Sequence, residues 1–345
     1  MESKKISICI TYYNQENFVR DSLESVFAIN FPCDYEILIG DDGSTDNTVN
    51  IVREYQKKYP NKIKLFVMDR NEKFKSINRA STNRLNLAQN VTGQYILFLD
   101  GDDFYCDKNF VKEALKVLEK DKSLIACAFN FRYLYENGKE SVFCQNMPYG
   151  CIDAKNYISK LFDTHSGAIV FRNILNLERM KFLKNINIFD DNAITIYFLK
   201  FGSLFFINKT VYVYRQLCNS LWNTLSILEQ NILNAFDYKY LCDLAPEFEK
   251  YIRARQCLSI NYVYKNRKNI ENFLKEKLKK YLLQAKENNN IFMFNILNWR
   301  NASFITKIST SIIYYKKYGF LFLKISFKQL AYRFKRKLLL GFRKN

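Results

Sequence analysis

Proline, glycine and histidine are scarce in this sequence. Its 345 residues include four Pro, ten Gly and one His, and its nine Cys contain no C-x-x-C pair. Structural zinc sites usually take their ligands from closely spaced Cys and His residues, so a single His and no C-x-x-C pair argue against one. We expect the cysteines to be free thiols, most of them buried.

Long hydrophobic runs are also missing. No stretch reaches the roughly 18 uninterrupted apolar residues that indicate a membrane-spanning helix. The opening residues, MESKKISICITYYN, lead straight into a strand-like pattern without the apolar segment of a secretory signal. The expected location is therefore the cytoplasm.

Acidic residues are absent from the end of the chain. Residues 301–345 carry eleven Lys and Arg and no acid, whereas residues 1–107 carry 13 basic and 16 acidic residues, a net charge of 13 − 16 = −3. The abundance of Lys, Asn, Ile, Phe and Tyr is typical of an AT-rich genome, so the total charge of +19 is weak evidence by itself. Its placement favours an anionic phospholipid surface for the tail and argues against a nucleic-acid partner.

The composition allows a large core, because 48% of the residues are hydrophobic in a length that suits two domains or one enlarged domain. The first hundred residues alternate strand-like and helix-like segments. Expected strands are Ile6–Thr11, Tyr35–Gly40, Ile63–Met68 and Tyr95–Leu99, separated by helices at Asn17–Ile29, after Ser44–Thr48 and at Ser81–Asn90. This alternation predicts an α/β fold with a mainly parallel sheet and helices on both faces.

Polar clusters follow three of these strands, at Thr11–Asn14, Asp41–Ser44 and Asp100–Asp103. Ligands bind beyond the carboxyl ends of parallel strands, so we expect the three clusters to meet at one edge of the sheet. The last cluster sets three carboxylates directly after the buried run YILFL. Because like charges this close repel one another, the carboxylates stay ionised only beside a bound cation or in ready contact with water.

The pattern changes after about residue 124. Strands are expected at Leu124–Tyr135, Gly167–Phe171, Leu204–Ile207 and Val211–Tyr214, with helices near 153–163 and 191–200. Beyond about residue 225 the sequence is helical and increasingly basic. We predict a first domain over residues 1–220 and a helical, basic C-terminal region over residues 221–345, from pattern alone because no Gly/Ser linker marks the boundary.

Four stretches together resemble glycosyltransferase family 2, the nucleotide-sugar-dependent transferases with the Rossmann-like GT-A fold. They are ICITYYNQENFVRDSLESV near the start, YEILIGDDGSTDNT at 35–48, GQYILFLDGDD at 93–103 and FDDN at 189–192. The resemblance covers roughly the first 215 residues. It implies that the first domain is a GT-A catalytic domain.

The resemblance implies a role for each cluster. Thr11 and Tyr13 would flank the nucleotide base, Asp42 would accept a hydrogen bond from it, and Asp100 would lie near the ribose. Asp102 would hold Mn²⁺ or Mg²⁺ on the diphosphate, because such an ion keeps waters and phosphate oxygens in its shell and needs only one or two carboxylates. The implied donor is a nucleoside diphosphate sugar, with UDP as the expected nucleotide.

Simpler interpretations remain open for the same residues. Thr11 and Tyr13 suit an ordinary strand end, Asp42 with Gly43 and Ser44 suits a turn and helix cap, and Asp102 suits a solvated turn. Asp103 is typical of a helix start rather than of a metal ligand.

An acidic pair, Asp190 and Asp191, precedes a helical pattern. The resemblance makes Asp191 the general base that takes the proton of the acceptor hydroxyl, and direct attack with one base gives inversion at the anomeric carbon. The same pair without a catalytic role would cap the helix and interact favourably with its dipole.

Two segments depart from the family pattern. The family's ARN stretch is replaced by STNRLNLAQN, so Arg84 is the best match for the arginine that helps hold the diphosphate, with Arg79 or Lys75 as alternatives. The family's YRxHxxS segment reads YRQLCNS, which puts Leu217 at the histidine position and removes that metal ligand. The family position of His165 suggests an acceptor-side loop, although a lone histidine is more often structural or merely polar, and it is not assigned to the metal.

The basic tail also has a helical pattern. A helix at 320–334 would place Phe320, Leu323, Phe327, Leu330 and Phe334 along one face, with lysines on other faces. This predicts a membrane-associating segment within residues 303–345. The alternative is an apolar stripe packed on the catalytic domain.

These features together predict an inverting, metal-dependent hexosyl- or N-acetylhexosaminyltransferase, peripheral on the inner face of the cytoplasmic membrane. Its acceptor would be a lipid-linked or surface-glycan precursor of lipopolysaccharide, lipooligosaccharide, capsule or a related polymer. The alternatives are a soluble transferase acting on a protein acceptor and a nucleotide-sugar-binding protein without transferase activity.

Overall fold

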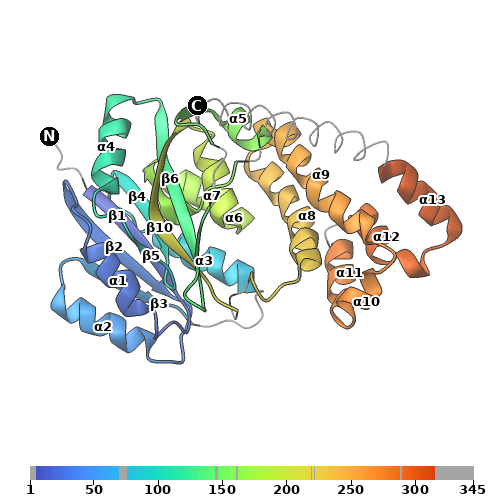
Figure 1. Cartoon of the computed structure of the whole chain (residues 1–345), viewed down its shortest axis with the longest axis horizontal. Helices are drawn as coiled ribbons and strands as arrows, with labels where there is room; N and C mark the ends of the chain where they lie inside the picture. Colours follow the sequence, from blue (N-terminus) through green and yellow to red (C-terminus); the bar gives the residue numbers. More distant parts are fainter. Residues whose placement is uncertain are drawn as a thin grey trace, which may run out of the picture. The chain divides into compact units, whose positions relative to one another are not determined.

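The computed structural model describes residues 5–69, 76–143, 147–160, 162–218, 220, 222–287 and 290–314. The chain divides into two compact units. The first contains residues 1–157 and 162–223, and the second contains residues 158–161 and 224–345. We describe each unit by itself (Figure 1).

One sheet runs through the first unit. Its strands are β1 (Lys5–Tyr12), β2 (Asp34–Asp41), β3 (Ile63–Val67), β4 (Tyr95–Asp100), β5 (Phe104–Tyr105), β6 (Leu124–Tyr135), β7 (Glu140–Val142), β8 (Gly150–Ile152), β9 (Ile169–Arg172) and β10 (Ser203–Gln216). The strand order is β3-β2-β1-β4-β9-β6-β10-β5, with β7 paired to β6 and β8 to β10.

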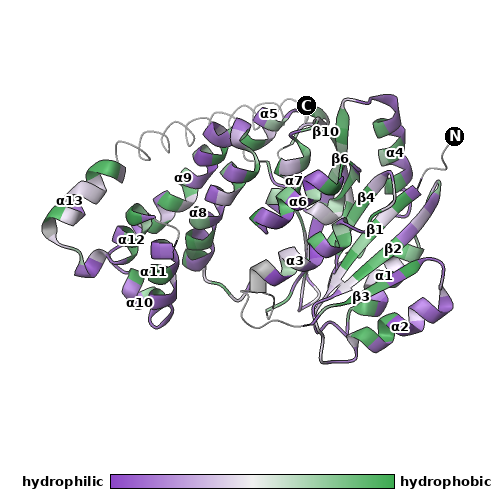
Figure 2. Cartoon of the chain, turned by 180° about the vertical axis from the view of Figure 1, so that it is seen from behind, coloured by the Kyte–Doolittle hydropathy of each residue, from purple (hydrophilic) through white to green (hydrophobic). Residues whose placement is uncertain are grey.

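The half of the sheet built from β1 to β4 is entirely parallel. All four strands expected in the first hundred residues are confirmed, within two residues at each end. Residues Ile6–Ile10 and Tyr95–Leu99 are buried throughout. Near-continuous burial is what a parallel strand covered on both faces requires, and Figure 2 shows hydrophobic residues along these strands.

The other half of the sheet is mixed. β9 runs antiparallel to both β4 and β6, whereas β10 runs parallel to β6 over a long ladder. The two separate strands expected at Leu204–Ile207 and Val211–Tyr214 form one strand, β10, whose register shifts between Ile207 and Thr210. The break in the hydrophobic pattern at Asn208-Lys209 therefore marks an irregularity within a strand and not a turn.

Helices cover both faces of this sheet. They are α1 (Val19–Phe27), α2 (Thr48–Lys58), α3 (Ser76–Ala88), α4 (Phe110–Lys120), α5 (Ala154–Ser159), α6 (Leu177–Ile186) and α7 (Asp191–Phe198), with a 3-10 turn, η1, at Ser166–Ala168. The sequence pattern did not predict α4 or α6. The fold is the expected α/β fold, with a parallel central region and helices on both sides.

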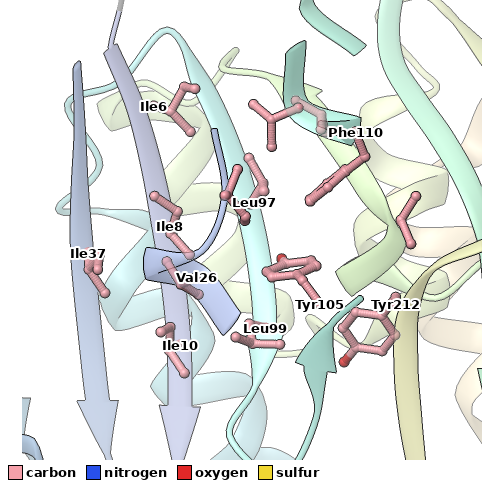
Figure 3. Close-up of a cluster of buried hydrophobic side chains, with 14 of the residues drawn as sticks. Ile6, Ile8, Ile10, Val26, Ile37, Leu97, Leu99, Tyr105, Phe110 and Tyr212 are labelled. Atoms are coloured by element: carbon pink, nitrogen blue, oxygen red, sulfur yellow. The ribbon is translucent and has the colours of Figure 1, made fainter. Parts of the chain in front are cut away.

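The largest core lies on one face of the sheet. Ile6, Ile8 and Ile10 project from one side of β1 and pack beside Leu97 and Leu99 of β4 (Figure 3). α1, α2 and α4 cover this face with their buried apolar side chains. The opposite face packs through aromatic rings, because Phe98 of β4 contacts both Phe171 and Phe189 with edge-to-face geometry.

The second unit is helical. Its elements are α8 (Ile227–Leu244), η2 (Pro246–Phe248), α9 (Glu249–Lys265), α10 (Ile270–Leu274), α11 (Lys277–Glu287), α12 (Ile291–Leu297), η3 (Trp299–Asn301) and α13 (Phe304–Ile313). They enclose a separate core that extends from Leu228 to Tyr314. A helical C-terminal region is confirmed for the part of the chain described, whereas the amphipathic helix predicted at 320–334 lies outside it.

None of the helices in the described ranges combines the length and hydropathy needed to cross a membrane. The eight cysteines within these ranges are all free thiols, as expected. Four of them are buried and three are exposed, so the expectation that most would be buried is only half right.

A buried glutamate joins β1, β2 and the turn before β4. Glu36 is 2% exposed, and its Oε1 accepts hydrogen bonds from the Ser7 hydroxyl at 2.8 Å and from the Thr92 hydroxyl at 2.6 Å. Its Oε2 pairs with the ammonium groups of Lys5 and Lys64, each at 3.1 Å. Every oxygen of this buried carboxylate is therefore satisfied.

We predict that Glu36→Gln destabilises the first unit in a pH-dependent way. Burial acts to raise the pKa of Glu36, but the hydrogen bonds from Thr92 and Ser7 and the lysine contact outweigh it and lower the pKa to about 2. The ionised group therefore stabilises the fold above its unfolded pKa, and this contribution is lost as the pH falls toward 2. Glu36→Gln should lower the free energy of unfolding by about 3 kcal/mol at pH 7 and by less at pH 3.5.

Urea denaturation at both pH values measures this difference. Glu54→Gln is the control, because Glu54 is 58% exposed where it pairs with Arg20 and should change the free energy of unfolding little. An equal loss at both pH values for Glu36→Gln would contradict the assignment.

Candidate active site

The carboxyl ends of β1, β2 and β4 meet at one edge of the sheet. The strand register places Thr11 beside Asp100 on one side and beside Gly40 on the other. The Thr11 hydroxyl lies 3.5 Å from Asp100 Oδ1, and the Asp42 amide donates to the Tyr12 carbonyl at 3.0 Å. The convergence of the three polar clusters at this edge is confirmed.

The two adjacent aspartates after β2 have different partners. Asp41 uses both oxygens locally, accepting from the Ser44 amide at 2.8 Å and from the Ser44 hydroxyl at 2.5 Å. Asp42 is nearly buried and pairs with Arg79 Nε at 3.2 Å. Asp41 therefore stabilises the turn, whereas Asp42 contacts Arg79 of α3. Tyr13, which directly follows β1, is 36% exposed.

The three carboxylates of the loop after β4 also separate. Asp100 Oδ1 accepts from Arg84 Nη2 at 2.5 Å. Asp103 is fully buried, with Oδ2 accepting from the Tyr212 hydroxyl at 2.5 Å and Oδ1 from the Arg215 amide at 2.8 Å. The expectation that Asp103 opens a helix is wrong, because α4 begins only at Phe110 and Asp103 instead anchors the loop to β10.

Asp102 has the fewest hydrogen-bond contacts of the three carboxylates in this loop. Its main-chain carbonyl is held by Arg215 Nη1 at 2.5 Å, but among the described residues its side chain has no hydrogen bond to another residue, only one from its own backbone. Burial, and then the negative charge of Asp100, raise the pKa of Asp102 to about 6. A bound cation would favour the ionised form, so this side chain suits metal binding.

Gly101 permits the close packing of the loop. A Cβ atom at this position would lie 2.1 Å from Cδ1 of the Tyr12 ring, well inside van der Waals contact. The Tyr12 ring is buried and its hydroxyl is hydrogen-bonded to Ser22 at 2.5 Å, so it has no room to move away. A glycine between Asp100 and Asp102 is therefore required by the packing of β1.

Asp190 and Asp191 open α7 and differ in their contacts. Asp190 is the N-cap, and its Oδ1 accepts from the Ala193 amide at 2.8 Å. Asp191 Oδ1 accepts from the Ser166 amide at 3.0 Å and lies 3.9 Å from His165 Nδ1. The capping interpretation therefore holds for Asp190, while Asp191 points to a different segment of the chain.

Asp191 remains ionised in this environment. Burial acts to raise its pKa, but the neighbouring His165 ring, the Arg84 guanidinium and the Ser166 amide together lower it to about 2. Arg84 is 12% exposed and also contacts the Phe189 carbonyl at 3.4 Å. The guanidinium thus lies between the end of β4 and the start of α7.

His165 lies inside the site, near Asp100 and Asp191, whereas sequence reasoning suggested only an acceptor-side loop for it. Its Nδ1 accepts from the Gly167 amide at 3.2 Å, and its Nε2 is 4.0 Å from Asp100 Oδ2. Its ring stacks on Tyr212 with centroids 4.6 Å apart. No spacing in the sequence links residue 165 to residues 100 and 191, because the contact arises from the sheet order alone.

Several oxygen atoms suit a divalent cation. Asp100, Asp103 and His165 bring ligand atoms within 4.8 Å of one another. The Asp103 carboxylate is buried and already bonded to Tyr212 and Arg215, so the open carboxylate oxygens are those of Asp100 Oδ2 and Asp102. Few carboxylates with room for further oxygen ligands fit Mg²⁺ or Mn²⁺.

The remaining sequence candidates are distributed as follows. Arg84 and Arg79 lie on α3, beside Asp100 and Asp42 respectively, and Lys75 lies outside the described residues. Arg215 was not assigned a role, yet its Nη2 pairs with Asp21 at 2.6 Å and its amide and Nη1 hold the Asp102-Asp103 loop.

Comparisons with known proteins bear on the family and on the fold. Residues 7–177 match the family model described as glycosyl transferase family 2. The poly(ribitol-phosphate) beta-glucosyltransferase of Bacillus spizizenii is 37% identical over 101 residues, which are 29% of this chain and 15% of that protein. The poly-beta-1,6-N-acetyl-D-glucosamine synthase of Staphylococcus epidermidis is 28% identical over 201 residues, which are 55% of this chain and 43% of that protein.

The fold has a counterpart among solved structures. S. aureus TarS 1–349 in complex with UDP-GlcNAc aligns with a TM-score of 0.58 and 16% identity, covering 90% of this chain and 92% of that chain. In contrast, the chain spans less than half the length of the curated relatives it matches.

We predict that Mn²⁺ binding depends on Asp102 and on pH. Asp102→Asn should weaken Mn²⁺ binding by about tenfold or more, because an amide oxygen carries no charge to offset the cation. In the wild type the affinity should fall as the pH drops below about 6, the pKa of Asp102, because the carboxyl group must then lose its proton to bind the ion.

Electron paramagnetic resonance of free Mn²⁺ at pH 7.5 and 5 measures both effects. Asp107→Asn is the matched control in the same segment, because Asp107 pairs with Lys209 at 2.8 Å outside the site. Unchanged binding in Asp102→Asn would rule Asp102 out as a ligand.

Proposed function

Residues 7–177 belong to glycosyltransferase family 2, and from this we propose that the chain transfers a sugar from a nucleoside diphosphate sugar to a hydroxyl group of a surface-glycan precursor, with inversion at the anomeric carbon. The observation that carries this proposal is the Arg84 guanidinium close to both the Asp100 carboxylate and an ionised Asp191, with the carboxylate of Asp102 following Asp100 in the same loop. Such a transfer needs a base for the acceptor proton, and it needs positive charge, from a cation and from a fixed side chain, near the leaving diphosphate.

The nucleotide is assigned to the β1–β2 side of this edge. Thr11 and the half-exposed ring of Tyr13 would flank the base, and Asp42, held by Arg79, would accept a hydrogen bond from it. Asp100 would contact the ribose. The UDP-GlcNAc bound to TarS, whose fold is similar, supports a UDP-linked donor.

A divalent cation, Mn²⁺ or Mg²⁺, would offset negative charge on the diphosphate as it leaves. Asp102, with Asp100 beside it, would hold this ion, and Arg84 would add a fixed positive charge near the same phosphates. Burial acts to lower the pKa of Arg84, but the negative charges of Asp100 and Asp191 outweigh burial and raise this pKa above its usual value. Arg84 therefore stays positively charged at every accessible pH.

Asp191 would act as the general base. The acceptor oxygen forms a bond to the anomeric carbon while the bond from that carbon to the diphosphate oxygen breaks, and the electron pair leaves with the nucleoside diphosphate. The acceptor proton passes to Asp191. The Ser166 amide, which donates to Oδ1, orients the carboxylate.

The acceptor is assigned to the bacterial cell surface on the names of relatives. The matched proteins include enzymes named for poly(ribitol phosphate) and for poly-N-acetylglucosamine. We propose a lipid-linked or surface-glycan precursor at the inner face of the cytoplasmic membrane, which the basic residues 301–345 would contact.

The described start of the tail adds detail to this membrane proposal. Ile305, Ile312 and Ile313 of α13 are between 45% and 78% exposed, which suits an apolar surface. Tyr314 instead stacks on Tyr264 with centroids 3.7 Å apart and is buried in the helical core. A truncation that tests membrane binding must therefore keep residue 314.

We predict that Asp191→Asn lowers turnover by about 10² or more while leaving the affinity for UDP nearly unchanged. Asparagine keeps an oxygen for the Ser166 amide but does not accept the proton. The measurement is UDP release from UDP-GlcNAc, UDP-glucose and UDP-galactose in the presence of Mn²⁺, with UDP affinity from calorimetry.

Asp190→Asn is the matched control. Asparagine is as good an N-cap as aspartate, so this variant should keep both the helix and most of the turnover. A collapse of UDP affinity together with turnover in Asp191→Asn would mean that Asp191 binds the donor or supports the fold.

We predict that a chain lacking residues 316–345 loses sedimentation with anionic liposomes. Ten of the eleven basic residues of the tail lie beyond residue 315, and each contributes on the order of 1 kcal/mol near an anionic membrane. Binding of the full chain should weaken with salt but persist in part through its apolar residues.

Vesicles of phosphatidylcholine alone are the control for charge, and UDP release is the control for folding. If the full chain and the truncated chain both fail to sediment with anionic vesicles, the membrane proposal is wrong and a soluble transferase is favoured.

A further inference from the structure

A row of aromatic side chains lies on one face of β6 and β10. These parallel strands pair Phe131 with Tyr212, and Tyr133 with Tyr214. Since alternate residues of a strand point to the same face, Tyr135 continues the row at the end of β6. We call Phe131, Tyr133, Tyr135, Tyr212 and Tyr214 the aromatic face.

The inner end of the aromatic face touches the candidate active site. The Tyr212 hydroxyl donates to Asp103, and the His165 ring stacks on Tyr212. His165 also lies 4.9 Å from the Tyr214 ring, between centroids, and its Nδ1 is 3.9 Å from Asp191 Oδ1. Burial, and then the charges of Asp103 and Asp191, raise the pKa of the Tyr214 hydroxyl. The row therefore starts beside the proposed base.

The outer end of the aromatic face is open to solvent. Tyr212 is fully buried and Phe131 is 5% exposed, whereas Tyr133 and Tyr214 are half-buried and Tyr135 is 39% exposed. The rings form a continuous series, with centroids of Tyr133 lying 5.8 Å from Tyr214 and 6.4 Å from Tyr135. The face thus leads from the proposed base to the surface.

The hydroxyl groups of the tyrosines in the aromatic face indicate that this face binds a ligand and does not only pack in the core. Within the described ranges, neither the Tyr133 hydroxyl nor the Tyr214 hydroxyl has a hydrogen-bond partner, while Tyr135 contacts the Ser141 hydroxyl at 3.2 Å. A row that only completed a core would be served by phenylalanine, as it is at Phe131 and Phe143, whose rings stack at 4.5 Å. Tyrosine suits a partner that is apolar on its face and polar at its edge.

Charge around this face argues against a phosphate-rich partner. The hairpin at 132–140 carries two basic and two acidic residues. Arg132 pairs with Glu140 at 3.4 Å, and Glu136 accepts from the Cys218 amide at 2.9 Å. Recognition of repeated phosphate groups calls for an excess of basic side chains, which the described part of this hairpin does not provide.

The face also lies away from the residues assigned to the nucleotide. In the strand order β2-β1-β4-β9-β6-β10, Thr11 and Asp42 lie at the ends of β1 and β2, whereas the aromatic face belongs to β6 and β10. The carboxylates that follow β4 lie between the two groups. A molecule on the aromatic face would therefore approach the reacting centre from the side opposite the nucleotide.

We propose that the aromatic face is the acceptor site and that it takes a pyranose ring of a glycan, not a polyol phosphate chain. The C–H bonds on one side of a pyranose carry partial positive charge and pack on the electron-rich faces of tyrosine rings, while its hydroxyls hydrogen-bond the phenols at the edge. This inference rests on the proposed function, since it identifies the acceptor class of the same site.

Saturation-transfer NMR tests the proposal with the full chain in the presence of UDP and Mn²⁺. The probes are methyl β-D-glucopyranoside, methyl β-D-galactopyranoside and methyl N-acetyl-β-D-glucosaminide, with ribitol 5-phosphate as the polyol phosphate. We expect saturation of ring C–H protons in at least one glycoside and less in ribitol 5-phosphate. Tyr135→Leu should reduce the glycoside signal by about fivefold, whereas Tyr135→Phe should retain most of it.

Tyr149→Leu is the matched control, because Tyr149 is 72% exposed and lies outside the aromatic face. It should leave the glycoside signal unchanged. Tyr133→Phe, which keeps the ring and removes one hydroxyl, should weaken binding by a smaller factor than Tyr135→Leu.

Three results would overturn the inference: stronger saturation of ribitol 5-phosphate than of every glycoside, equal glycoside signals in the wild type and Tyr135→Leu, or no saturation of any glycoside. Thermal stabilisation of the wild type by UDP distinguishes failure of the acceptor inference from failure of the proposed function. If UDP stabilises the protein while no glycoside is saturated, the acceptor inference is wrong and the donor assignment stands. If UDP has no effect, the proposed function fails as well.

Discussion

The guanidinium group of Arg84 is the interaction on which the site depends. It donates to Asp100 at the end of β4 and contacts the Phe189 carbonyl just before α7, so it joins two parts of the chain that each bring a carboxylate. The charge of Arg84 lies close to both Asp100 and Asp191, and it helps to lower the pKa of Asp191. The fixed charge of arginine therefore offsets negative charge at the end of β4 and at the start of α7.

Around this cation, the neighbouring acids acquire different properties from their surroundings. Asp103 is buried and hydrogen-bonded, and it serves as an anchor between the loop after β4 and β10. Asp102 has no such partner within the described ranges, and burial with the charge of Asp100 raises its pKa to about 6. Asp191 has its pKa lowered to about 2 despite burial, through His165, Arg84 and the Ser166 amide. Carboxylates whose environments push their pKa values apart are typical of sites that divide chemical roles among similar groups.

The same sheet gives the site two dissimilar sides. The parallel half, from β3 to β4, ends in polar loops with Thr11 and Asp42, which suit a nucleotide. The mixed half brings β6 and β10 together in a long ladder, so their tyrosines form a continuous surface that reaches the carboxylates. The carboxylates lie where the parallel and mixed halves meet, and the two sides present different surfaces to the two substrates that we propose.

The sequence by itself determined the strands of the parallel half and the position of the polar clusters at their ends. Hydrophobic runs such as Tyr95–Leu99 are local features, and a parallel strand buried on both faces leaves few other ways to place them. The acidic start of α7 could likewise be predicted, because capping and helical spacing are local. The family resemblance rests on these same local segments.

Only the tertiary structure decided which acids are available and what surrounds them. Asp103 meets Tyr212 and Arg215, more than a hundred residues away in the chain, so neither its burial nor the openness of Asp102 could be inferred from three adjacent carboxylates. His165 joins the site because η1 precedes β9, which lies between β4 and β6. The burial and charge pairing of a side chain depend on contacts between distant segments, and the order of strands in a sheet, which sets those contacts, leaves no trace in local periodicity.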